Sequence, residues 1–141
     1  MVDNCTPAVR SKIMSSVAQK NTGPEMYVRR LIHRMGYRYA LHRRDLPGRP
    51  DLVFAPRRKI VFVHGCFWHG HTCRKGRLPT SRADYWAERI GKNQARDASN
   101  ISDLEADGWD VCIVWECEIS DPDSLRRRLV HFLDTELLVS S

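Results

Sequence analysis

The chain has 141 residues, of which 42% are hydrophobic and 28% are charged. This length predicts one domain over residues 1–141, and this composition excludes a disordered chain, because it supplies enough apolar side chains for one core. The net charge of +6 at pH 7 suits a polyanionic partner without identifying it. No apolar stretch approaches the roughly 18 residues of a membrane span, and the first residues lack an apolar signal core. We therefore expect a cytoplasmic protein without a membrane partner.

The first predicted element is a short helix over residues 9–17. A second helix opens at Thr22, because Thr22 and Glu25 have the spacing of a capping box, and apolar residues follow at helical intervals as far as Gly36. Three strands are predicted over residues 37–41, 51–54 and 60–63, which are rich in β-branched or aromatic side chains. The short connection between the last two predicts an antiparallel pair.

A long loop is expected over residues 65–82, and its length favours a functional role. The longest helix follows over residues 82–107, and its expected buried face consists of Ile90, Ala98, Ile101 and Leu104. A strand over residues 109–115 and a C-terminal helix within residues 120–141, opened by Asp121-Pro122-Asp123, complete the chain. This order predicts an α/β fold in which helices flank a mixed β-sheet.

Histidines and cysteines concentrate at the start of the long loop. Structural zinc sites take four thiolate or imidazole ligands, and Cys66, His71 and Cys73 provide three of them. Cys117, just beyond the last strand, is the natural fourth ligand and would fasten the loop to the sheet. The alternative is that Cys117 is a buried thiol, which is how we interpret Cys112 within its apolar strand. An odd number of cysteines favours thiols or metal ligation over a disulfide framework.

An acidic residue and a histidine are expected to meet at the ends of adjacent strands. Asp51 opens one strand and His64 follows the next, and a carboxylate is the ligand that Mg²⁺ prefers. His64 and His69, left over from the zinc set, suit proton transfer or charge stabilisation. Turn statistics alone favour Asp51 as a turn residue, and spacing alone favours Glu25 as a helix cap rather than a support for the Mg²⁺ water shell. The other histidines, His33, His42 and His131, are interpreted as solvated or packing residues.

Large aromatic side chains stand among basic residues on the long loop. Phe67 and Trp68 can enter between base pairs as a wedge when a rigid loop holds them, and Trp86 on the following helix would add a third ring. The same helix also carries groups suited to groove contacts, Arg89, Lys92 and Asn93. Trp86 has a competing interpretation as a core residue. This pattern predicts nucleic acid as the partner.

Several motifs together resemble those of a known family, the very short patch repair DNA mismatch endonucleases, bacterial enzymes related to the restriction-endonuclease fold. The motifs are Arg10-Ser11-Lys12 with Met14, Leu46-Pro47-Gly48-Arg49-Pro50-Asp51, His64-Gly65-Cys66-Phe67-Trp68-His69, Ile90-Gly91-Lys92-Asn93 and Val114-Trp115-Glu116-Cys117. The resemblance implies a restriction-endonuclease-like mixed sheet with a structural zinc site. It also implies an enzyme that nicks double-stranded DNA 5′ to the thymine of a T:G mismatch left by deamination of 5-methylcytosine.

The resemblance implies roles for particular residues. Asp51 and the main-chain carbonyl of Val63 would hold the Mg²⁺ needed for hydrolysis, Glu25 would support its water shell, and His64 and His69 would act at the scissile phosphate. The structural zinc would be held by Cys66, His71, Cys73 and Cys117.

The implied DNA contacts come from two parts of the chain. Phe67, Trp68 and Trp86 would enter the duplex beside the mismatch, while Met14 approaches from the other side. Met14 and Lys12 belong to an N-terminal DNA-contacting segment over residues 1–21.

Two other classes of function share part of this pattern. One is a zinc-stabilised DNA-binding module without catalysis. The other is a zinc hydrolase or deaminase, which is disfavoured because the sequence lacks the motifs H-E-x-x-H and H-x-E with P-C-x-x-C. For the endonuclease we expect a monomer, because one nick in one strand needs one active site, and a functional link to a DNA cytosine methyltransferase.

Overall fold

The computed structural model describes residues 22–135 of the chain. The predicted helix over residues 9–17 and the segment over residues 1–21, with Lys12 and Met14, lie outside this part. The described elements are α2 (Gly23–Arg34), β1 (Ala40–Leu41), β2 (Leu52–Phe54), β3 (Lys59–His64), α3 (Ala83–Ala106), β4 (Asp110–Trp115) and α4 (Pro122–Asp134). Short 3₁₀ turns, η1 (Ala55–Arg57), η2 (Arg74–Gly76) and η3 (Glu116–Ser120), lie between them.

The sheet has four strands in the order β1-β2-β3-β4. β1 pairs with β2 and β2 with β3 in antiparallel fashion, which confirms the predicted hairpin, while β4 lies parallel to β3 after the crossover through α3. The mixed α/β architecture is therefore as predicted. The register of the parallel pair sets His64 opposite Trp115. The segments that follow these two strands consequently leave the same end of the sheet side by side.

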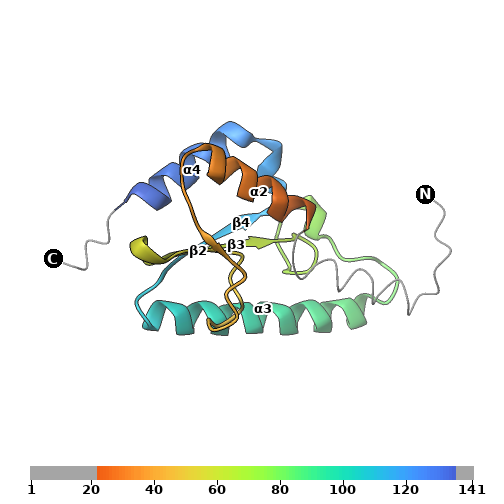
Figure 1. Cartoon of the computed structure of the whole chain (residues 1–141). Coiled ribbons are helices and arrows are strands. Elements are labelled where there is room, and N and C mark those ends of the chain that lie inside the picture. Colours follow the sequence, from red (N-terminus) through yellow and green to blue (C-terminus); the bar gives the residue numbers. More distant parts are fainter. Residues whose placement is uncertain (1–21, 136–141) are drawn as a thin grey trace.

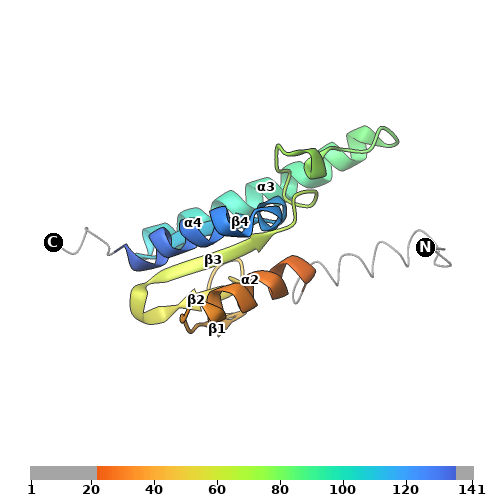
Figure 2. The ribbon, with the colours of Figure 1, turned by 90° about the horizontal axis from the view of Figure 1, so that it is seen from above.

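Helices cover both faces of the sheet. Figure 1 shows α2 and α4 on one face and α3 on the other, and Figure 2 shows α2 over the β1–β2 side and α4 over the β4 side. Successive side chains of a strand point to opposite faces of the sheet, so they pack alternately into the core beneath α2 and α4 and the core beside α3. In β3, Val61 packs with the α2–α4 core, whereas Ile60 and Phe62 pack with Leu104 of α3. Within residues 22–135, no helix has both the length and the apolar character needed to cross a membrane.

The first strand is shorter than expected, at two residues rather than residues 37–41. The two tyrosines in that stretch serve the α2–α4 core instead of the sheet. The Tyr37 hydroxyl donates a hydrogen bond to Asp134, and the Tyr39 hydroxyl donates one to the carbonyl oxygen of Arg29. Both side chains also pack against the core cluster. Side-chain anchoring therefore replaces strand pairing here.

The long helix α3 buries Ile90 and Leu104, with Ile101 partly buried, as predicted. The expectation for Ala98 is wrong, because Ala98 is exposed. The inward stripe runs through positions 90, 97, 101 and 104 at intervals of seven, four and three residues. Position 98 lies about 90° around the helix from the centre of this stripe. Asp97 therefore takes the inward place that the sequence analysis assigned to Ala98.

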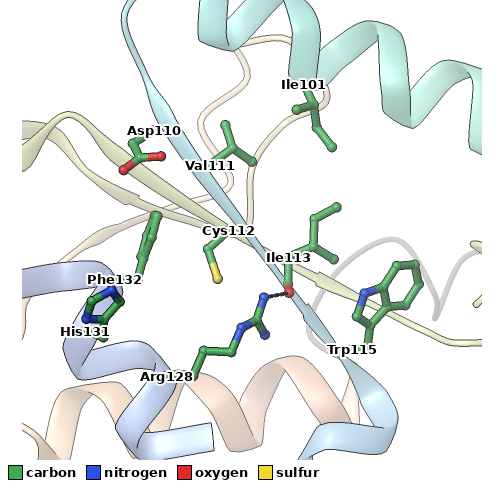
Figure 3. A pocket seen from close by; sticks show the side chains of 9 residues that line it. All are labelled: Ile101, Asp110, Val111, Cys112, Ile113, Trp115, Arg128, His131 and Phe132. Atoms are coloured by element: carbon green, nitrogen blue, oxygen red, sulfur yellow. Dashed lines mark hydrogen bonds between the residues drawn. The ribbon is translucent and has the colours of Figure 1, made fainter. Parts of the chain in front are cut away.

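The outer edge of the sheet borders a pocket of about 510 Å³ between α3 and α4. Figure 3 shows Arg128 of α4 pointing at the edge of β4, where its guanidinium donates to the Ile113 carbonyl oxygen at 2.8 Å. Unpaired carbonyl groups on an edge strand invite pairing with another chain. Arg128 satisfies one of them and places a charge at the edge.

We predict that Leu129→Ala lowers the free energy of unfolding by about 2–5 kcal/mol, because it leaves a cavity between α4 and the sheet, where Leu129 is fully buried. Val130→Ala on the same helix is the matched control, since Val130 is 39% exposed. Its effect should stay within about 0.5 kcal/mol. Urea denaturation followed by circular dichroism measures both values, and equal effects would contradict the assigned orientation of α4.

Candidate active site and metal centre

Asp51 directly precedes β2 and faces β3. Its Oδ2 accepts a hydrogen bond of 2.7 Å from the backbone N–H of Val63, so the carboxylate lies one residue from His64 along the neighbouring strand. Burial raises the pKa of Asp51 to about 7; the bond from Val63 opposes this rise and the nearby Glu25 carboxylate adds to it. A cation bound beside these carboxylates would relieve both causes of the rise.

Glu25 takes part in the helix cap through its backbone and in the site through its side chain. The Thr22 hydroxyl accepts a hydrogen bond from the Glu25 N–H at 3.2 Å, which confirms the predicted start of α2. The Glu25 carboxylate is buried, with Oε2 2.7 Å from His42 Nε2 and 3.6 Å from Arg29 Nη1. Ligand atoms of Glu25, His42 and Asp51 all lie within 4.8 Å of one another. We call these three residues the carboxylate cluster.

His64 and His69 stack face to face, with ring centroids 3.7 Å apart and planes 7° from parallel. Burial lowers the pKa of His64 to about 3, and His69 lowers it further while Asp97 opposes the shift. His64 is therefore a neutral imidazole at neutral pH. Its Nδ1 is buried and has no hydrogen-bond partner among residues 22–135.

Asp97 completes a second group, the histidine cluster, with His64 and His69. Its Oδ2 lies 2.6 Å from His69 Nδ1, so the ring donates to the carboxylate. Asp97 is not among the site residues predicted from the sequence, because apolar residues alone defined the predicted buried face of α3. A usable signal was present, since Asp97 is a charged residue on the inward stripe between Ile90 and Ile101.

The four residues predicted to bind zinc come together at the same end of the sheet. Cys66 follows β3, His71 and Cys73 lie in the long loop, and Cys117 lies in η3 just after β4. Their ligand atoms are all within 4.8 Å of one another, and His71 Nδ1 is 3.5 Å from Cys117 Sγ. Two thiols and an imidazole from one segment plus a thiol from another form a set typical of structural zinc.

The protonation preferences of these thiols differ. Burial raises the pKa of Cys66 to about 12. For Cys73, burial acts in the same direction, but hydrogen bonds with His71 and Cys66 outweigh it and lower the pKa to about 6. A bound divalent ion would hold all three cysteines as thiolates. Cys112 lies in the α2–α4 core instead, which agrees with its interpretation as a packing residue.

Trp115 lies between the predicted zinc ligands and the histidine cluster. Its indole stacks on His71 with centroids 4.2 Å apart, and it meets His64 edge to face at 5.4 Å. The loop closes tightly around these residues at Gly76, where a Cβ atom would lie 1.9 Å from the His71 carbonyl oxygen. Only glycine fits there. Because Trp115 contacts both rings, the position of His71 is coupled by packing to that of His64.

The three predicted wedge residues form one surface group. Phe67 lies edge to face with Trp68 at 5.2 Å and with Trp86 at 5.3 Å, and the two indoles are 5.9 Å apart. All three rings are half-buried and belong to neither core cluster. The interpretation of Trp86 as a core residue is therefore wrong.

Polar residues of α3 support this aromatic group in different ways. The Arg89 guanidinium lies 5.5 Å from the Trp68 ring and donates to the Tyr85 hydroxyl. The Asn93 amide donates to the Trp68 carbonyl oxygen at 2.9 Å, so this side chain holds the loop. Lys92 is exposed and lies 3.4 Å from Glu88.

Comparison with known proteins agrees with this arrangement. The family described as DNA mismatch endonuclease Vsr matches residues 2–75. The Type II nicking enzyme V.XorIIP of Xanthomonas oryzae pv. oryzae is 54% identical over 134 residues, which cover 95% of this chain and 98% of that protein. The Type II nicking enzyme V.NmeAIP of Neisseria meningitidis serogroup A is 42% identical, over 92% of each chain. The DNA mismatch endonuclease Vsr of Escherichia coli K12 is 41% identical over 89% of this chain and 80% of its own length. The chain therefore belongs to the Vsr family of DNA mismatch endonucleases.

Proposed function

We propose that this protein nicks double-stranded DNA 5′ to the thymine of a T:G mismatch that arises from deamination of 5-methylcytosine, by Mg²⁺-dependent hydrolysis of one phosphodiester bond. Membership of the family makes it a DNA-cleaving hydrolase. One observation carries the hydrolytic mechanism. The carboxylate cluster and the histidine cluster are attached to neighbouring residues of β3, because the Val63 N–H donates a hydrogen bond to Asp51 and His64 is the next residue.

The donor set beside β3 fits Mg²⁺. Asp51 would hold the ion together with the main-chain carbonyl of Val63, and Glu25 would support its water shell, since hard cations take carboxylate, carbonyl and water oxygens. The raised pKa of Asp51, caused first by burial, supports a cation site between these groups. Bound there, Mg²⁺ would polarise a phosphoryl oxygen and stabilise the leaving oxygen.

The two stacked histidines suit different tasks at the scissile phosphate. Burial lowers the pKa of His64 to about 3, so this ring is a weak base and would act at the phosphate as a neutral hydrogen-bonding group. His69 donates to Asp97, and this carboxylate orients the ring and would stabilise it in its protonated form. Two rings 3.7 Å apart do not readily carry two positive charges. We therefore assign proton acceptance to His69, whose protonated form Asp97 would stabilise, and charge stabilisation at the phosphate to His64.

The Cys/His set would hold a structural Zn²⁺ that fixes the long loop. This loop carries His69, Phe67 and Trp68, so the ion would place a catalytic group and two wedge residues together. Phe67, Trp68 and Trp86 would unstack the duplex beside the mismatch. Arg89 and Lys92, with Lys12 and Met14 of the N-terminal segment, would contact the DNA.

A non-catalytic DNA-binding module would need the zinc staple and the aromatic wedge but neither of the other clusters. Two adjacent carboxylates and a stacked histidine pair backed by Asp97 have a purpose only in the catalytic proposal. We also propose that the enzyme acts as a cytoplasmic monomer and is linked in function to a DNA cytosine methyltransferase.

The proposed substrate predicts a sharp dependence on the mismatch. Duplexes that differ only by T:G or T:A at one position should be nicked on the thymine strand only when T:G and Mg²⁺ are both present. Denaturing gel electrophoresis of an end-labelled strand locates the nick. Equal cleavage of the two duplexes would reject the proposed specificity, and undiminished cleavage in chelator would reject the metal requirement.

Asp51→Asn should reduce nicking by at least about a thousandfold, because it removes the charged oxygen ligand while the metal supplies several kcal/mol of stabilisation. Binding of a T:G duplex, measured by fluorescence anisotropy, should remain. Asp103→Asn is the control, since Asp103 is exposed on α3. Full nicking by the Asp51 variant would contradict the mechanism.

The four-ligand set predicts one tightly held zinc ion per chain, by analogy with closed structural sites. Cys117→Ala should lose the ion and lower the thermal unfolding temperature, whereas Cys112→Ala should keep the ion, because Cys112 lies in the α2–α4 core. Inductively coupled plasma mass spectrometry measures the zinc content. A folded wild-type protein without zinc would remove this assignment.

A further inference from the structure

His42 is the member of the carboxylate cluster to which the proposed mechanism gives no role. The sequence analysis interpreted it as a solvated or packing residue, and the structure contradicts this. Its Nε2 lies 2.7 Å from Oε2 of Glu25, and its side chain is only 24% exposed. A polar ring at hydrogen-bond distance from a buried carboxylate has a specific partner.

The sheet register ties His42 to Asp51 through the backbone. β1 pairs with β2 through Leu41 and Leu52, so His42 and Asp51 are the next residues across the pair. The His42 N–H donates to the Asp51 carbonyl oxygen at 3.3 Å. His42 itself has a left-handed backbone with φ of 49°, which ends the strand at this point. One residue thus contacts Asp51 through its backbone and Glu25 through its ring.

Holding Glu25 requires such a contact because two carboxylates are placed close together in a buried setting. When both groups are ionised, their like charges repel. Donors from two elements converge on Oε2 of Glu25, with His42 at 2.7 Å and Arg29 at 3.6 Å. The His42 contact is the shorter, and it comes from the residue that directly follows β1, the strand that pairs with β2. It therefore links the Glu25 carboxylate to the backbone that carries Asp51.

We propose that His42 is a positioning residue of the divalent-cation site, which acts by holding the Glu25 carboxylate beside Asp51. The inference rests on the proposed function, because it takes Asp51 and Glu25 as the groups that serve the cation. Partners that orient metal-binding groups typically contribute about 10–100-fold to metal affinity or activity. In the alternative role, His42 Nε2 would itself be a ligand of the cation, and every variant without the imidazole would then bind the cation more weakly.

The test uses the zinc-loaded full chain and Mn²⁺ as the probe, with the dissociation constant measured by electron paramagnetic resonance. His42→Gln keeps an N–H donor, whereas His42→Met has a similar length and no donor. We expect the Met variant to bind Mn²⁺ about 10–100-fold more weakly and the Gln variant to bind as wild type does. Nicking by the Met variant should recover at saturating Mn²⁺. His33→Gln, at an exposed position of α2, is the control and should change neither quantity.

Two results would overturn the proposal. The first is wild-type affinity in a folded Met variant. The second is equal weakening in the Gln and Met variants, which would show that the imidazole itself is the ligand. Zinc content and circular dichroism report folding, and His42→Ala provides a second donor-free variant if the Met variant unfolds. Asp51→Asn distinguishes a failure of the proposed cation site from a failure of the role of His42 alone. Unchanged Mn²⁺ binding in that variant would reject the cation site of the proposed function, whereas loss of binding there with no effect at His42 would reject only the role of His42.

Discussion

The parallel pairing of β3 with β4 decides where the functional side chains lie. Its register sets His64 opposite Trp115, so the residues that follow the two strands emerge together. Cys66 and Cys117 are then close enough for the Cys117 N–H to reach the Cys66 sulfur at 3.4 Å. A shift of this register would separate the two halves of the Cys/His set. The long loop would then lose the contact of Cys66 with Cys117, which joins it to the segment that follows β4.

Three groups of polar residues depend on this end of the sheet. The carboxylate cluster is attached through the bond from Val63 to Asp51, the histidine cluster through His64 at the end of β3, and the Cys/His set through its neighbours on both strands. Trp115 contacts His64 on one side and His71 on another. The groups are thus packed as one unit, so an ion held by the Cys/His set, as proposed, would also fix the orientation of His69.

The sequence predicts those parts of the structure that local pattern and ligand count determine. Strand propensity and turn length predict the β2–β3 hairpin. The need for a fourth soft ligand predicts that Cys117 lies beside Cys66, although about 50 residues separate the two in the sequence. Asp97 and His42 are not predicted as site residues, because their positions in the site depend on tertiary contacts. Asp97 looks like one more charge on a helix until α3 is packed against the loop. His42 looks like a strand end until β1 is paired with the Asp51 strand.

Locating the metals in crystals of the full chain, grown with zinc and then soaked in Mn²⁺, tests the central claim most directly. Anomalous scattering at the two absorption edges distinguishes the ions. The account predicts zinc at Cys66, His71, Cys73 and Cys117, and manganese at Asp51 beside Glu25. Manganese bound instead between His69 and Asp97, or absent from Asp51 while zinc occupies its own set, would contradict it.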